Sequence, residues 1–455
     1  MSVESTMDRQ ARLSQAEHRA PALVAAVYRS DRPLWSVAIG TSGTPRALDD
    51  ATLFRIGSIT KTFTAVMVMQ CREEGLLDLD DPIGRHLDLP AHSDATVRRL
   101  LSHTSGLQRE PYGDVWDTLE LPSAERLVAD LERAERVLAP GRRFHYSNLA
   151  FSLLGLLVAR LRGGTWAEVL ADRVLGPLAL TDIVVTPGER AAVGYLVDAY
   201  SDHARPEPST DFGGVGPAAQ LWSTAAGMAT WAAFLSAPAT VDPAERVLKA
   251  STVEEMRWPL TVTDGLNWTA GFGLGLLLVP MPERVLHVGH DGAMPGFLAA
   301  AYGRCGGAGT PPAIGAAVLV SSGTAAGALG LSHSLMDTAI REDPAAVEPW
   351  APSAPAPDEY QSILGRWWSE GFEFVFTWRG GALQARRLVD PAAAPAAVFT
   401  PIEGVVDELR VTGGREVGER LRLHRDEGGA VRLMHWATYR FTRVQETFEG
   451  HAASG

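Results

Sequence analysis

The sequence predicts an α+β region followed by a small antiparallel β domain, and three observations support this. Two β-prone runs lie near the start of the chain, at 23–28 and 34–39, and two more lie at 285–303 and 313–321. Strands at both ends of a helix-rich middle imply one antiparallel sheet flanked by helices, with an all-helical cluster packed beside it. From residue 358 onward, apolar and polar residues alternate between Gly pairs, which predicts a second, all-β domain.

Turn and cap residues place the first elements. The run 30–33 (SDRP) separates the two N-terminal strands and predicts a hairpin. The apolar segment 63–69 has no polar stripe, which indicates a buried core helix, and Gly75 offers its C-terminal stop. Thr96 has the chemistry of an N-cap for the next helix.

Two longer helices are expected in the middle of the chain. Residues 123–138 alternate charged and apolar side chains at helical spacing, and residues 223–235 have the pattern of an amphipathic helix. Both would join the helical cluster or cover the sheet. We therefore expect an active site at the seam between the cluster and the sheet.

An Ala/Pro-rich stretch divides the chain. Residues 344–357 (PAAVEPWAPSAPAP) have the composition of a semi-extended linker, so the predicted domains are residues 1–343 and residues 358–455. In the second domain, Gly380-Gly381 and Gly428-Gly429 supply turns between alternating apolar runs, as in a small antiparallel sheet or barrel. A stabilising cap and a substrate lid are both open as its role.

The run Ser58-Ile59-Thr60-Lys61 is the most informative motif for the function of this chain. On a helix, positions i and i+3 share a face, so Lys61 Nζ can reach Ser58 Oγ. Gly57 suits a sharp entry that places the hydroxyl at the positive end of the helix dipole. That position stabilises a developing oxyanion, and burial lowers the pKa of a lysine toward the range of a base. The run predicts a serine nucleophile with a lysine base.

Two later segments carry matching chemistry. In the segment 140–148, the Tyr146 phenol could relay a proton and the Asn148 amide could donate to a substrate carbonyl. In the segment 288–293 (VGHDGA), His290 stands at a glycine-flanked strand start. Missing side chains there let a substrate lie against the strand backbone.

With these motifs in the order Ser-x-x-Lys, Tyr-x-Asn and His-x-Gly, the chain resembles the serine β-lactamase and penicillin-binding-protein superfamily. The resemblance is to the class C-like branch that holds esterases, D-aminopeptidases and penicillin-binding-protein-type thioesterases, and it covers roughly residues 20–340. It implies a β-lactamase/transpeptidase-like fold, and residues 358–455 are similar in pattern to a lipocalin-like domain. The supporting runs are LLSHTSGL at 100–107, QLWSTA at 220–225 and GFGLG at 271–275.

The resemblance assigns the chemistry to three side chains and requires neither a cofactor nor a metal. It implies that Ser58 is the acyl-accepting nucleophile, Lys61 its base partner and Tyr146 a general acid/base. A metal site at His287 and His290 is disfavoured, because residues three apart on a strand point to opposite faces.

The resemblance also implies a substrate-binding set made of Asn148, His290, Gly292 and Ala293. Asn148 would orient the substrate amide, and the backbone N–H groups of Ser58 and Ala293 would form the oxyanion hole. β-Lactamases and cell-wall transpeptidases usually carry lysine where this chain has His290. A histidine is typical of the esterase, peptidase and cyclising-thioesterase relatives, so we expect β-lactam hydrolysis to be disfavoured.

The composition indicates which classes of binding partner and which cellular compartment to expect. The chain has 455 residues, 46% of them hydrophobic, with a net charge of −13 and no cluster of Lys and Arg among aromatics. A nucleic-acid or membrane partner is therefore not expected. Residues 1–20 lack the apolar stretch of a secretory signal, and the two cysteines fit a reducing compartment, so the expected location is the cytoplasm.

The predicted function is that of a serine hydrolase or acyltransferase of esterase or peptidase type, acting on an ester, amide or thioester. Two alternatives stay open. One is a penicillin-binding-protein-type thioesterase that cyclises a non-ribosomal peptide, with a peptidyl thioester substrate and a carrier protein as partner. The other is a catalytically weak ligand-binding or sensor homologue. The intact motif set favours an enzyme, because a sensor need not keep Tyr146.

Overall fold

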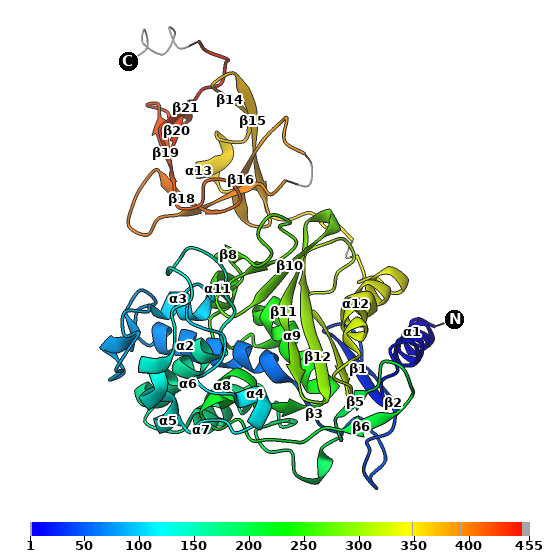
Figure 1. Ribbon diagram of the computed structural model, residues 1–455. Coiled ribbons are helices and arrows are strands. Elements are labelled where there is room, and N and C mark those ends of the chain that lie inside the picture. The colour runs from blue at the N-terminus through cyan, green and yellow to red at the C-terminus, as the bar shows by residue number, and fades with distance from the viewer. Residues whose placement is uncertain (1, 348, 392–393, 448–455) are drawn as a thin grey trace. The chain divides into compact units, whose positions relative to one another are not determined.

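The structure is a computed structural model that describes residues 2–347, 349–391 and 394–447. The chain divides into two compact units, residues 1–347 and residues 348–455, which we call the large unit and the small unit (Figure 1). Each unit has a hydrophobic core of its own.

An eight-stranded antiparallel sheet forms the centre of the large unit (Figure 1). The strand order is β2-β1-β13-β12-β11-β10-β9-β8, and β1 lies beside β13 with Leu23 opposite Val320. The predicted sheet, built from both ends of a helical middle, is thus confirmed. Its strands are β1 (Ala22–Arg29), β2 (Trp35–Gly40), β8 (Thr261–Val262), β9 (Gly271–Phe272), β10 (Leu277–Met281), β11 (Val285–Met294), β12 (Phe297–Cys305) and β13 (Ile314–Val320).

A tight turn at Pro295 and Gly296 divides the run 285–303 into two strands. The sequence predicts extended chain throughout this run, whereas β11 and β12 form a hairpin. Pro295 has no N–H to donate to a neighbouring strand, and Gly296 has a φ of +74°, which a side chain would disfavour. The turn places Ala293 of β11 opposite Leu298 of β12.

The helical cluster contains the buried core helix that the sequence predicts, α2 (Thr60–Glu73). All its residues from Thr60 to Cys71 are buried, and Gly75 follows its end with a φ of +72°. Thr96 caps the next helix, as expected. The other helices of the large unit are α1 (Val3–Glu17), α3 (Val97–Leu101), α4 (Val115–Thr118), α5 (Ala124–Ala129), α6 (Asn148–Arg162), α7 (Trp166–Leu170), α8 (Gly216–Ala219), α9 (Ala225–Ser236), α10 (Pro238–Val241), α11 (Ala250–Met256) and α12 (Leu331–Glu342).

Short 3-10 turns and strands complete the large unit. A 3-10 turn (Gly57–Ile59) precedes α2, and another (Asp130–Arg133) follows α5. The helix predicted over 123–138 therefore ends early, because Arg136 pairs with Leu107 in an isolated bridge. The short strands are β3 (Phe54–Arg55), β4 (Ile183–Val184), β5 (Tyr195–Val197), β6 (Ala204–Pro206) and β7 (Trp222–Ser223).

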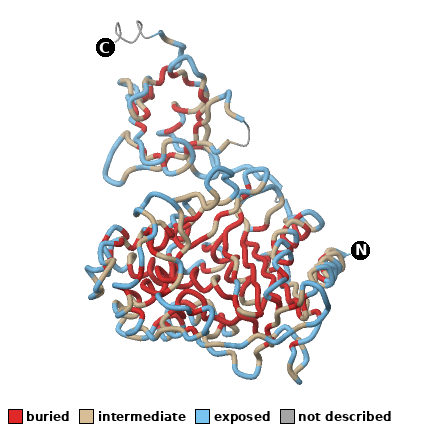
Figure 2. The backbone as a smooth tube through the Cα atoms, in the orientation of Figure 1, coloured by how far each residue is buried: buried red, intermediate tan, exposed pale blue. Residues whose placement is uncertain are grey.

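Helices cover both faces of the large sheet. Successive side chains of a strand point to opposite faces, so Leu23 and Val24 of β1 belong to different cores. The helix α9 lies in the core of Val24, whereas α1 and α12 lie in the core of Leu23. Figure 2 shows the strands between these helices as buried.

The helix α9 lies between the sheet and α2. Its Trp231 ring stacks on Phe63 with centroids 3.9 Å apart, and the Trp231 Nε1 donates to Thr62 Oγ1 at 2.8 Å. On the sheet side, Gly303 of β12 lets the α9 backbone approach. The amphipathic helix predicted over 223–235 is therefore wrong in character, because both sides of α9 are covered and most of its residues are buried.

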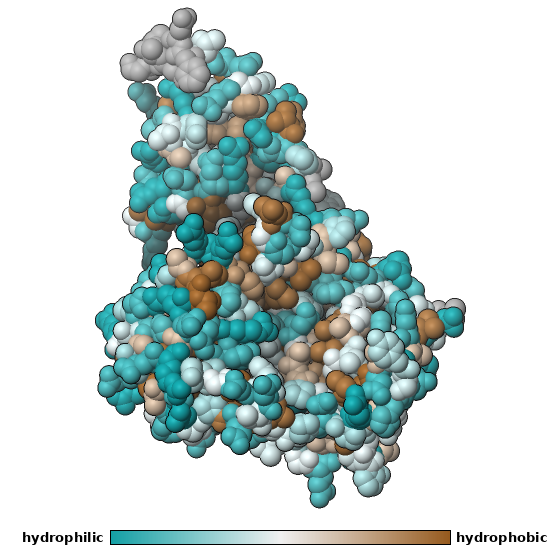
Figure 3. Space-filling view, viewed as in Figure 1, coloured by the Kyte–Doolittle hydropathy of each residue, from teal (hydrophilic) through white to brown (hydrophobic). Residues whose placement is uncertain are grey.

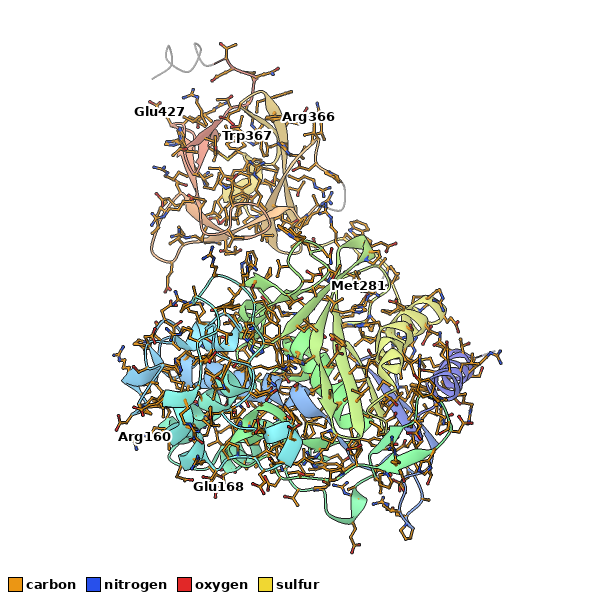
Figure 4. All side chains as sticks on the ribbon, viewed as in Figure 1. Arg160, Glu168, Met281, Arg366, Trp367 and Glu427 are labelled. Atoms are coloured by element: carbon orange, nitrogen blue, oxygen red, sulfur yellow. The ribbon has the colours of Figure 1, made fainter. Side chains whose placement is uncertain are left out.

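The small unit is a nearly closed antiparallel barrel, which confirms the expected all-β domain. Among the described residues, eight strands pair in chain order, and Trp368 pairs with Thr442 to bring the first and last strands together. Trp367 is buried in its core while Arg366 is exposed (Figure 4). Its elements are α13 (Asp358–Gln361), β14 (Gly365–Ser369), β15 (Phe372–Arg379), β16 (Ala382–Arg387), β17 (Ala397–Pro401), β18 (Glu408–Gly413), β19 (Arg420–Arg425), β20 (Val431–Trp436) and β21 (Tyr439–Phe441).

The visible surface is mostly hydrophilic, with smaller hydrophobic areas between (Figure 3). Charged side chains such as Arg160 and Glu168 point outward from the helical cluster (Figure 4). Within the described part of the chain, the helices are too short or too polar to cross a membrane.

We predict that Gly303→Ala destabilises the large unit by roughly 1–3 kcal/mol, because the new Cβ would lie 2.2 Å from the Ala232 carbonyl oxygen and force α9 away from the sheet. Thermal and urea unfolding of the whole chain would measure this. The matched control is Gly330→Ala, which places its Cβ in open space. Equal midpoints for the two variants would contradict the close packing of α9.

Candidate active site

Two glycines bring the sheet against the turn that carries Ser58. Gly57 has a φ of +50°, and a Cβ there would lie 2.8 Å from the Ala293 nitrogen. A Cβ on Gly292 would lie 1.9 Å from the Ile56 carbonyl oxygen. A larger residue at either position would push β11 away, so both glycines are needed for this approach. The turn that carries Ser58 and the backbone at Ala293 consequently lie against one another.

Lys61 is fully buried on the first turn of α2. Its Nζ lies 3.1 Å from Ser58 Oγ. It donates to Asn148 Oδ1 at 2.6 Å and to the Ala218 carbonyl at 2.9 Å. Burial lowers the pKa of Lys61 well below the usual lysine value, and the negative charge of Glu110 opposes this only in part. These conditions favour a neutral amine beside the serine hydroxyl.

Tyr146 lies beside the lysine on the segment that leads into α6. Its ring centroid is 4.8 Å from Lys61 Nζ and 4.9 Å from the Arg109 guanidinium carbon. The hydroxyl is buried and makes no hydrogen bond of normal geometry among the described residues. Burial raises the pKa of Tyr146, which the nearby Ser58 hydroxyl opposes. The phenol is therefore protonated at neutral pH and has a proton to give.

Asn148 is the first residue of α6, and both ends of its amide are used within the chain. Oδ1 accepts from Lys61. Nδ2 donates to both carboxylate oxygens of Glu110, at 2.8 and 2.9 Å. Ser147 caps the helix by accepting from the Ala150 N–H, which fixes the backbone from which Asn148 extends. The predicted contact of Asn148 with a substrate amide stays a prediction.

His290 occupies β11 close to the tyrosine, with ring centroids 6.0 Å apart. Its Nδ1 donates to the Asp291 carbonyl oxygen at 2.5 Å, so Nε2 carries the lone pair of the neutral ring. That Nε2 is buried and has no partner among the described residues. Burial and the neighbouring Lys61 lower the pKa of His290 to about 4. His290 therefore offers a neutral hydrogen-bond acceptor.

The two histidines of β11 have different neighbours. His287 Nδ1 lies 2.7 Å from Nδ1 of His333 on α12, whereas His290 lies near Tyr146 on the side of the helical cluster. No group of three or more His, Cys, Asp or Glu side chains that could hold a metal ion is found in the described ranges.

Three residues near Lys61 are not predicted from the sequence as members of the site. Arg109 and Glu110 follow the Ser105-Gly106-Leu107 run in a loop with no pattern of its own. His103 lies just after α3, and its Nδ1 accepts from the Ser147 N–H at 3.1 Å. Its ring centroid, however, lies only 4.3 Å from that of Tyr146. A loop that places a residue near Lys61 has no regular spacing in the sequence, so no pattern could have predicted these contacts.

Two family models match the chain. One, described as Beta-lactamase, matches residues 7–329, and the other, described as a domain of unknown function, matches residues 356–443. The first covers most of the large unit, including every residue of the site described above.

Curated relatives match the large unit. A human beta-lactamase-like protein is 31% identical over an alignment of 273 residues, and the match covers 54% of this chain and 51% of that protein. The chain thus spans about half the length of this human relative. Penicillin-binding protein 4 of Amycolatopsis lactamdurans is 30% identical over an alignment of 304 residues, and the match covers 62% of this chain and 77% of that protein.

A solved structure, the crystal structure of SurE, matches most of the chain. It has a TM-score of 0.63 and 25% identity, and the match covers 97% of this chain and 99% of that one. A second crystal structure of SurE, with D-Leu, matches at a TM-score of 0.58 with the same identity and coverage.

We predict that Lys61 loses its charge at a lower pH than an ordinary lysine, because its burial penalises the ammonium form. Lys61 and Lys249 are the two lysines of the chain, so NMR of protein labelled at lysine Nζ and Cε gives two side-chain signals. Lys61→Met identifies one, and the other belongs to the exposed Lys249. If Lys61 kept an ordinary lysine titration, its role as a neutral base would be refuted.

Proposed function

This chain belongs to the beta-lactamase family, and we propose that it is a serine hydrolase or acyltransferase that forms an acyl-enzyme on Ser58 from an ester, amide or thioester. The observation that carries the proposal is the buried Lys61 amine, 3.1 Å from Ser58 Oγ. A hydroxyl next to a neutral amine can be deprotonated as it attacks, which is the requirement for nucleophilic catalysis by serine.

The first half-reaction follows from these contacts. Ser58 Oγ attacks the acyl carbon while its proton passes to Lys61 Nζ, and the carbonyl oxygen becomes an oxyanion. The N–H groups of Ser58 and Ala293 would hold that oxyanion, since Gly57 and Gly292 let the two backbone segments approach closely. Collapse breaks the bond to the leaving group, which takes the proton of the Tyr146 phenol, and the proton on Lys61 restores that phenol.

The second half-reaction decides the outcome. An attacking water or amine gives a proton to the same residues and displaces the acyl group from Ser58. Water yields a carboxylic acid, whereas an amine yields a new amide. Both outcomes regenerate the free serine with no net change in the protons held by the site.

The environment of His290 supports neutral acyl donors. Its pKa of about 4 leaves the ring uncharged above roughly pH 5, so the third motif lacks the fixed cation that attracts a substrate carboxylate. The free Nε2 accepts a hydrogen bond and therefore suits a substrate N–H. Arg109 brings a positive charge to the same region, but Glu110, with 3.4 Å between Nε and Oε1, offsets it.

A second candidate is a penicillin-binding-protein-type thioesterase that cyclises a peptide delivered by a carrier protein. The acceptor Nε2 of His290 could accept a hydrogen bond from the N–H of an amine nucleophile. Cyclisation needs such a nucleophile, whereas hydrolysis uses water. The likeness to the SurE structure with D-Leu covers 97% of this chain and supports a substrate that contains a D-residue. A sensor without turnover is the remaining alternative.

We expect a fluorophosphonate probe to add once to the chain at Ser58, because the neighbouring amine activates that hydroxyl. Intact-mass measurement should show a single adduct that is lost in Ser58→Ala. Ser102, which donates to the Arg98 carbonyl and is not next to an amine, provides the matched control Ser102→Ala. An adduct that persists without Ser58 would refute the nucleophile.

Substrate choice should favour neutral acyl donors over carboxylate-bearing β-lactams, because His290 carries no charge at neutral pH. The measurement compares kcat/KM for p-nitrophenyl butyrate, a peptidyl thioester with a D-residue at the acyl end, and nitrocefin. His290→Lys should raise the relative rate with nitrocefin by restoring a cation. Nitrocefin as the fastest substrate of the unchanged protein would overturn this proposal, and a cyclic product from the thioester alone would favour the cyclase.

A further inference from the structure

Glu110 reaches the site from a loop that is tied to the start of α6. The Asn148 N–H donates to the Arg109 carbonyl at 2.7 Å, and the Ser147 hydroxyl donates to the Gln108 carbonyl at 2.7 Å. These bonds hold the Glu110 carboxylate under the Asn148 amide, where it accepts both contacts from Nδ2. The Glu110 side chain is only 21% exposed. The carboxylate does not contact Ser58 or Lys61 directly, according to the hydrogen bonds and ion pairs of the described residues.

We propose that Glu110 is a positioning residue for the acyl transfer proposed above: it locks the Asn148 amide with Oδ1 toward Lys61 and so points the lone pair of the lysine at Ser58. This inference rests on the proposed function, because the lone pair matters only if Ser58 is a nucleophile.

The number of donors on Lys61 makes the orientation decisive. A neutral amine has two N–H groups and one lone pair. The Ala218 carbonyl can only accept, and it takes one N–H at 2.9 Å. Asn148 Oδ1 can only accept, and it takes the other at 2.6 Å. The third direction, toward Ser58 Oγ at 3.1 Å, is therefore left for the lone pair, and the serine must donate along it.

The carboxylate of Glu110 excludes the opposite orientation of the amide. If the Asn148 amide turned over, its Oδ1 would face two carboxylate oxygens, with no proton between acceptors. A buried acceptor without a donor is costly, so the turned amide is disfavoured. Glutamine at position 110 would lift this restriction, because its own amide can donate to Asn148 Oδ1. The turned Asn148 would then direct its Nδ2 at Lys61 and occupy the lone pair.

Charge adds a second, independent signature. Glu110 raises the pKa of Lys61, although burial outweighs it, while Arg109 lowers that pKa. The other titratable side chains around the lysine are His103, Tyr146 and His290. Removing the negative charge of Glu110 should lower the pKa of Lys61 further. The acidic limb of the pH–rate profile, on which Lys61 must lose its proton, then moves to lower pH.

The test compares Glu110→Gln with Glu120→Gln, an equal change of charge at an exposed position of the same unit. We expect Glu110→Gln to lower kcat for a p-nitrophenyl ester by about 10- to 100-fold with little change in KM. Its acidic limb should move to lower pH, and the Lys61 NMR signal should titrate at lower pH as well. Glu120→Gln should change none of these.

A second substitution separates orientation from a general loss of structure. In the double variant Glu110→Gln/Asn148→Asp, the side chain at position 148 has two carboxylate oxygens and no N–H. One oxygen can accept from Lys61, and the other can accept from the amide of the glutamine. The double variant should recover part of the lost rate, with an acidic limb at higher pH than in the unchanged protein, because the carboxylate now touches Lys61.

The outcomes distinguish this inference from the proposed function. A normal acylation rate and pH profile in Glu110→Gln would overturn the role of Glu110 and leave the Ser58 nucleophile intact. Failure of the double variant to recover any rate, with both variants folded by circular dichroism, would also overturn it. Absence of Ser58 acylation in the unchanged protein would instead refute the proposed function, while the Lys61 titration would still report on Glu110.

Discussion

The burial of one amine, that of Lys61, is the constraint on which the site depends. Removing an ammonium group from water is costly, and the structure surrounds this one with neutral acceptors rather than a carboxylate in direct contact. The neutral amine is therefore favoured, and that is the form which can take a proton from Ser58. The pKa values of Tyr146 and His290 are shifted by burial as well, so the interior of the large unit acts on all three groups.

Close backbone packing provides the other half of the arrangement. The seam between the sheet and the helical cluster exists because Gly57 and Gly292 have no side chains where β11 meets the turn before α2. The cluster is held in turn by α9, which packs against the sheet on one side and against Phe63 of α2 on the other. Ser58, Lys61 and the Ala293 backbone thus come from elements whose relative positions leave little freedom.

Much of this arrangement could be predicted because its signals are local in sequence. The helical spacing of Ser58 and Lys61, the cap at Thr96 and the Gly pairs of the small unit each report on their own neighbourhood. The sequence predicts less well those features that depend on contacts between segments far apart in the chain. The helix α9 lost its amphipathic character because α2 covers its outer side, and the helix predicted over 123–138 ended early because Arg136 pairs with Leu107.

The sequence by itself determined the fold class and predicted a division into two domains and the residue types proposed for acyl transfer, because these depend on periodicity, composition and motif spacing. Only the tertiary structure decided the chemical state of the site. Whether Lys61 is charged, which nitrogen of His290 carries a proton and which way the Asn148 amide faces all depend on burial and on partners from other segments. Glu110 shows this best, since it acts through Asn148, 38 residues away along the chain, and a contact between distant segments leaves no local pattern.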